Sequence, residues 1–166
     1  MTDYTDLIAQ LKVRLDSFGD GRDLTSDNAK AVWYADRVMV QSIISGLMNI
    51  DSDLAKPERQ LAEKIAERDA YLAKRTELEE ELAVVVTSFV DSRARDNEHD
   101  RRYRCEQQLR LLDRGELLYA PGQAYPRLAD LDVRISELTE KIARLKAKHH
   151  AYKLQAEAVL GATVTN

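Results

Sequence analysis

The stretch that decides the fold is LADLDVRISELTEKIARLKAKHHAYKLQAEAVLG, residues 128–161. Apolar side chains recur in it at alternating steps of three and four residues, and one His interrupts them. This spacing is the a/d seam of a coiled-coil heptad repeat, so the stretch predicts one long helix with a single packing face. The seam that we expect to pack consists of Leu128, Leu131, Ile135, Leu138, Ile142, Leu145, His149 and Tyr152.

The composition of the whole chain also indicates a helical protein. Its 166 residues include only 6 Gly and 3 Pro, too few for the turns that a β fold of this length needs. A third of the residues are charged and only 6% are aromatic, which favours narrow apolar stripes over a thick core. The composition therefore predicts an all-α protein.

Two shorter helices precede the long ones. Apolar residues at helical spacing fill residues 4–18, and Gly19-Asp20-Gly21 stops them. Ser26 or Asp27 is a suitable N-cap for the next helix, which runs to about Ile50 and is the most apolar part of the chain. We expect residues 1–52 to form a small N-terminal helical pair, with an apolar head made of Trp33, Val38, Ile43, Ile44 and Leu47.

Residues 53–166 are expected to form an elongated helical hairpin or coiled coil. Pro57 suits the first turn of a helix, and neither Gly nor Pro occurs from there to Gly115. Acid-first pairs at i,i+4, such as Glu98 with Arg102, support helix through the polar residues 91–108. We therefore predict one continuous helix from about Pro57 to Arg114, a turn at residues 115–126, and a final helix that folds back on the one before it.

The apolar heptad seam must be buried against a partner, and the preceding helix is a poor partner for it. Opposite the middle of the seam that helix would offer Ser92, Asp96, His99 and Tyr103. Three alternatives remain: an irregular hairpin register, cover by the N-terminal helices, or cover by a second chain. We favour a homo-oligomer, because three amphipathic stripes and a long helix with a polar middle do not close into a tidy monomer.

Residues that could carry chemistry are few. Asp96 and His99 share a helical face, but a di-metal bundle site needs a second such pair, which the sequence lacks. His149 is expected to set the register of the seam instead of binding metal. Cys105 lies beside Arg104, which would lower the pKa of its thiol, yet no catalytic His partner is recognisable in the sequence. We predict a non-enzymatic protein with no catalytic residue, no metal site and no cofactor.

The best candidate for a functional surface is a basic segment with an interleaved tyrosine. Arginine and tyrosine in this arrangement suit phosphate contact and base stacking, so the segment suggests association with nucleic acid. The same pattern is also the ordinary exterior of a coiled coil or a protein-binding face. The residues of this basic segment are Arg101, Arg102, Tyr103, Arg104 and Arg110.

Taken together, these features predict a helical interaction protein. It would act as a scaffold, adaptor, chaperone or inhibitor, by protein-protein binding and self-assembly through coiled-coil faces. Nucleic-acid association is the alternative, although a net charge of −4 is too small and too mixed to favour a polyanion partner. An acidic start without an apolar segment and a lone Cys105 favour a cytoplasmic protein that does not enter membranes.

Overall fold

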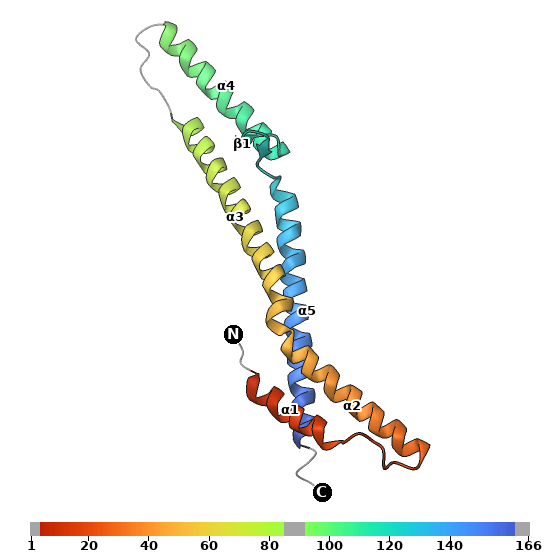
Figure 1. Cartoon of the computed structure of the whole chain (residues 1–166). Coiled ribbons are helices and arrows are strands. Elements are labelled where there is room, and N and C mark those ends of the chain that lie inside the picture. The colour runs from red at the N-terminus through yellow and green to blue at the C-terminus, as the bar shows by residue number, and fades with distance from the viewer. Residues whose placement is uncertain (1–3, 85–91, 162–166) are drawn as a thin grey trace. The chain divides into compact units, whose positions relative to one another are not determined.

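The computed structural model describes residues 4–84 and 92–161. These residues form five helices and one short hairpin, so the protein is all-α, as the sequence predicts. None of the helices in these ranges is long and apolar enough to cross a membrane. The elements are α1 (Thr5–Ser17), α2 (Asp27–Met48), α3 (Ile50–Ala83), α4 (Ser92–Arg114), β1 (Leu118–Ala120), β2 (Gln123–Ala124) and α5 (Leu128–Gly161) (Figure 1).

The chain divides into two compact units, each with its own core. Residues Met1–Glu58 and Glu140–Asn166 form the first unit, and Arg59–Thr139 forms the second. Both α3 and α5 therefore contribute one end to each unit. The division at residue 52 that the sequence suggests stays a prediction about which segments fold independently.

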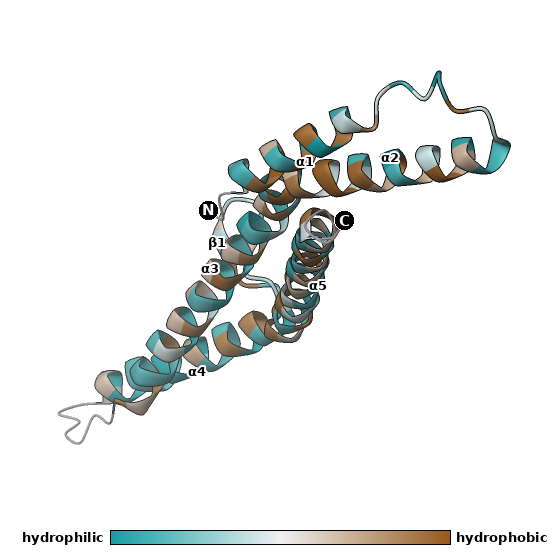
Figure 2. Cartoon of the chain, turned by 90° about the horizontal axis from the view of Figure 1, so that it is seen from below, coloured by the Kyte–Doolittle hydropathy of each residue, from teal (hydrophilic) through white to brown (hydrophobic). Residues whose placement is uncertain are grey.

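The first unit is built around α2. Its N-terminus is capped as predicted, because the Ser26 Oγ accepts a hydrogen bond from the Ala29 N–H at 3.1 Å. The indole N–H of Trp33 donates to the Phe18 carbonyl at 2.9 Å and so ties α2 to the end of α1. In Figure 2, α1 and α2 lie side by side, and much of α2 is coloured hydrophobic. The buried core consists of Leu11, Val40, Ile43, Ile44, Leu47, Ile50 and Ala156.

The start of α3 differs from the prediction. The helix begins at Ile50 and Pro57 lies inside it, so the expectation that Pro57 opens the helix is wrong. The Asn49 carbonyl accepts from both the Asp53 N–H and the Ser52 hydroxyl, at 2.9 Å each, and this starts α3 directly after α2. Burial of Ile50 in the core of the first unit outweighs the preference of proline for a first turn.

The end of α3 also differs. Val84 is not helical, so the prediction of one unbroken helix from Pro57 to Arg114 is wrong at that residue. Val84 opens a run of three valines, and β-branched side chains favour helix less than the residues before them. The rest of the predicted continuity, at residues 85–91, lies outside the described residues.

In the second unit, α4 runs back along α3 (Figure 1). The Tyr71 hydroxyl donates to the Asp113 carboxylate at 2.8 Å, and Arg75 donates to the same oxygen at 2.7 Å. Burial and this hydrogen bond to Asp113 raise the pKa of Tyr71, so its hydroxyl keeps its proton. The buried core of this unit consists of Tyr71, Leu78, Leu112 and Leu131.

The predicted turn at residues 115–126 contains two changes of direction instead of one. Gly115, with φ of 75°, ends α4 in a Schellman motif, in which the Glu116 N–H bonds to the Leu111 carbonyl at 2.8 Å. The antiparallel pair β1 and β2 then reverses the chain again. In the second unit α5 packs on α3, where Arg68 lies 3.9 Å from Asp132, and Leu131 also shares a core with Leu112 at the end of α4.

Candidate functional site

The heptad seam of α5 is covered inside a single chain. All eight residues that the sequence singles out are buried or half-buried. Leu131 packs in the core of the second unit with Tyr71, and Tyr152 packs on the core of the first. Within each unit the described contacts of the seam involve α3: Leu131 shares a core with Tyr71 in the second unit, and His149 lies near Asp53 in the first. Among the described residues, these eight side chains therefore do not form an open apolar stripe.

His149 lies in the seam and faces the start of α3. Its side chain is 4% exposed, and its Nε2 lies 3.7 Å from the Asp53 carboxylate. Neither ring nitrogen has a hydrogen-bond partner within the described chain. Facing one carboxylate from a buried position suits a residue that fixes the register of two helices. The described residues hold no group of three or more His, Cys, Asp or Glu side chains placed to bind a metal ion.

The other candidate reactive or metal-binding residues, Asp96, His99 and Cys105, lie on α4 and differ in exposure. Asp96 and His99 are exposed on α4. Cys105 is 3% exposed, and its burial and its hydrogen bond to Glu81 raise the pKa of the thiol. The neighbouring Arg101 and Arg104 lower this pKa by less, so the pKa of the thiol is raised despite the adjacent arginines. A protonated, buried thiol is a poor nucleophile.

The residues of the basic segment differ in their contacts: Arg101 is half-buried, and the others are exposed. Arg101 donates to the carbonyls of Glu81 and Val84, the second at 3.1 Å, and thereby satisfies the open C-terminal end of α3. It also pairs with Glu98 at 2.6 Å, which lowers the pKa of that carboxyl. Glu98 thus pairs at i,i+3 instead of with the predicted Arg102. The members of the segment that remain exposed are Arg102, Tyr103, Arg104 and Arg110.

The predicted apolar head contains a core part and an exposed part. Ile43, Ile44 and Leu47 are buried, and Trp33 is half-buried. Val38 is 44% exposed and points away from this core. It belongs to a surface that sequence reasoning missed, although its signal, the scarcity of charge in residues 38–50, is visible in the sequence.

We call that surface the outward face of α2. Every exposed side chain from residue 31 to residue 48 is uncharged, in a protein of which a third is charged. The two charged residues within this span, Asp36 and Arg37, are half-buried, and Arg37 donates to the Gly19 carbonyl at 2.6 Å. Contiguous exposed apolar surface can mark an interaction site. The face consists of Ala31, Val32, Tyr34, Ala35, Val38, Met39, Gln41, Ser42, Ser45 and Met48.

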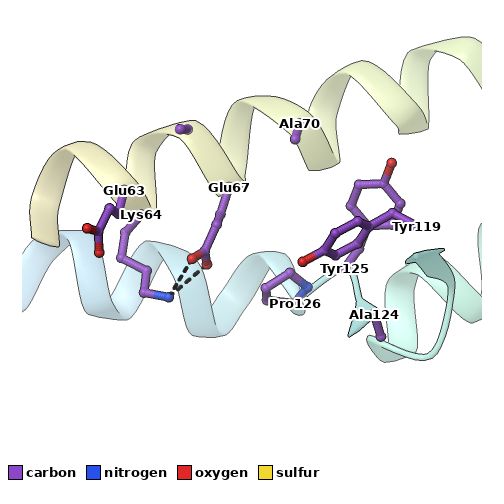
Figure 3. Close-up of a pocket in the computed structure, with 9 residues that line it drawn as sticks. Glu63, Lys64, Glu67, Ala70, Tyr119, Ala124, Tyr125 and Pro126 are labelled. Carbon is purple, nitrogen blue, oxygen red and sulfur yellow. Dashed lines mark hydrogen bonds and ion pairs between the residues drawn. The ribbon is translucent and has the colours of Figure 1, made fainter. Parts of the chain in front are cut away.

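A groove in the second unit is another surface that the sequence did not reveal. It lies between α3 and the hairpin, and its lining includes Ala66, Ala70, Tyr119 and Tyr125. Figure 3 shows Ala70 on α3 and the two tyrosine rings beside each other. These tyrosines flank the Pro121-Gly122 turn, which the sequence marks only as a connection.

We compared the chain with known protein families, curated proteins and solved structures. The chain matches no protein-family model, and it has no match among curated proteins or among solved structures.

Proposed function

We propose that this chain is a non-enzymatic helical interaction protein that binds protein partners, a second copy of itself among them, through the outward face of α2. The observation that carries the proposal is the absence of charge from all exposed side chains between residues 31 and 48. Tyr34 and Val38 project from this face with 66% and 44% of their surface exposed. Covering such side chains on association is favourable, since about 25 cal/mol is gained for each Å² of apolar surface removed from water.

A second copy can be placed on this face with a two-fold axis at Val38. In an antiparallel pair of α2 helices related by a two-fold axis at Val38, Ala31 lies opposite Ser45 and Tyr34 opposite Ser42. Small residues at these positions let two helix backbones approach closely and leave room for the tyrosine ring. No charge is buried in such a contact, so no desolvation of ions opposes it.

The proposed mechanism is bridging or occlusion by a rigid helical surface. A scaffold, an adaptor, a chaperone and an inhibitor would all use this mechanism. The identity of the bound partner determines which of these roles the protein has. The buried, reduced Cys105 supports a cytoplasmic setting for this activity.

Cross-linking through an introduced cysteine tests the contact. In the Val38→Cys variant two thiols meet at the proposed axis, so mild oxidation should yield a covalent dimer. The matched control is Val133→Cys, because Val133 is 60% exposed on α5 and lies outside the outward face of α2. A Val38→Cys variant that cross-links no faster than the control contradicts the proposal.

Nucleic-acid association is the second candidate, and the exposure of Arg102, Tyr103 and Arg104 along α4 favours it. Its signature would be salt-dependent binding of short DNA or RNA that is lost when Arg102, Arg104 and Arg110 are changed to Glu. Fluorescence anisotropy at low salt measures this, and an unchanged signal there rejects the second candidate.

A further inference from the structure

The groove of the second unit has two apolar walls. Ala66 and Ala70 of α3 line one side, and Tyr119, Tyr125 and Pro126 line the other. Figure 3 labels Ala70 and the three residues of the second side. Its volume is about 640 Å³, which lies within the range of sites that hold small ligands or short peptide segments. The alanines leave the bottom of the groove open, because longer side chains at these positions would fill it.

The two tyrosines are held side by side by the hairpin. Their ring centroids are 5.1 Å apart and the rings are tilted by 59°. The Tyr125 N–H donates to the Leu117 carbonyl at 2.9 Å, which fixes the position of Tyr125 directly after β2. Tyr119 is 57% exposed, so its ring is accessible to a ligand. Because the two rings contact each other, they leave no gap for a cation between them, and they offer their outer faces to the groove instead.

Two carboxylates and one ammonium group line the rim of the groove. Glu63 and Glu67 line it together with Lys64, which pairs with Glu67 at 2.8 Å. Glu63 is more available, since its ion-pair partner Arg59 is 3.7 Å away and both side chains are largely exposed. The hydroxyls of the two tyrosines have no hydrogen-bond partner within the described residues, so both can donate to a ligand.

We propose that this groove binds an extended, proline-rich segment of another protein that carries a basic residue beside its prolines. Aromatic-lined grooves bind polyproline II segments, because the preformed helix loses little entropy on binding. Proline rings would pack on the tyrosine faces, the tyrosine hydroxyls would donate to peptide carbonyls, and Glu63 would pair with the basic residue.

The occupant comes from another protein because this chain has no such segment. Its three prolines, Pro57, Pro121 and Pro126, are at least five positions apart. The proposal is independent of self-association, since the groove belongs to the second unit and the outward face of α2 to the first.

Peptide binding by the full chain tests the proposal. The probe is a short fluorescein-labelled peptide of Pro-Pro-Leu repeats that ends in two arginines, and its anisotropy is followed as protein is added. Tyr119→Ala should weaken binding about tenfold, because one ring face is lost. Tyr103→Ala is the matched control, since Tyr103 is 58% exposed on α4 and does not line the groove, and it should leave the affinity unchanged.

Further variants separate the parts of the site. Glu63→Gln should weaken the arginine-bearing peptide and leave a peptide with alanines in place of the arginines unaffected. Tyr119→Phe keeps the ring, so it should bind more tightly than Tyr119→Ala; circular dichroism confirms that each variant is folded. Val38→Glu, which alters the other unit, should bind the peptide normally.

Three results would overturn the proposal. The first is the absence of binding at about 1 mM protein, which corresponds to less than about 4 kcal/mol of binding free energy. The second is equal binding of a peptide in which alanine replaces every proline. The third is an equal loss of affinity in Tyr119→Ala and Tyr103→Ala.

Discussion

The role of several single residues in this protein depends on the helix that packs against them. Gly46, in the middle of α2, is an example. A Cβ at this position would lie 2.5 Å from the ring of Tyr152 on α5, so the absence of a side chain lets α5 approach α2 in the first unit. Cys105 is a second example, because burial beside Glu81 raises the pKa of its thiol despite the adjacent arginines.

Gly46→Ala tests the first of these contacts. Alanine favours helix over glycine by about 0.5–1 kcal/mol, but the added methyl collides with a packed ring, and overpacking costs about 1–3 kcal/mol. We expect the variant to lose about 1–2 kcal/mol of unfolding free energy in urea. Gly161→Ala is the control, because nothing lies within 4 Å of a Cβ there. Equal stability of the two variants would contradict the close packing of Tyr152 on α2.

At the scale of elements, the helices follow from local patterns and their boundaries and partners do not. The extent of α5 could be predicted because its heptad pattern is written in consecutive residues. The start of α3 could not, because burial of Ile50 overrides the signal of Pro57. The partner of α5 also could not be predicted, since a short segment at residues 115–126 reverses the chain twice.

The interaction surfaces, too, could be predicted from the sequence only in part. The lack of charge on α2 is visible in the sequence, but only the structure shows that Val38 points outward while Ile43 is buried. The groove could not be predicted, because packing in the second unit brings Tyr119 against Ala66, residues that are far apart in the chain.

The end of α3 gives a prediction at this scale. Arg101→Ala removes the donor that satisfies the last carbonyls of α3 and leaves Glu98 without its partner, so it should lower the urea midpoint. Arg102→Ala, its exposed neighbour, should leave the midpoint within error.

The destabilisation should also depend on pH. Arg101 lowers the pKa of Glu98, so the stability that this pair contributes is present above the ordinary carboxyl pKa of 4.5. It is lost as the pH falls through the lower, folded-state pKa. The difference between Arg101→Ala and the unmodified protein should therefore shrink in acid, and a difference that grows there would contradict the ion pair.

At the scale of the whole molecule, each compact unit carries a candidate interaction surface that the described residues leave exposed. The first unit presents the outward face of α2, and the second presents the groove beside Tyr119. A protein that self-associates through one unit and binds an extended peptide through the other would link its partners in pairs. This division of roles is consistent with a scaffold or adaptor.

The central claim is association through α2, and the mass of the protein in solution tests it most directly. Sedimentation equilibrium at tens of micromolar should give twice the chain mass of 18.9 kDa for the unmodified protein and for Val133→Glu. Val38→Glu, which places a charge at the proposed axis, should give the mass of one chain. A single-chain mass for the unmodified protein, or a doubled mass that persists in Val38→Glu, would contradict the account.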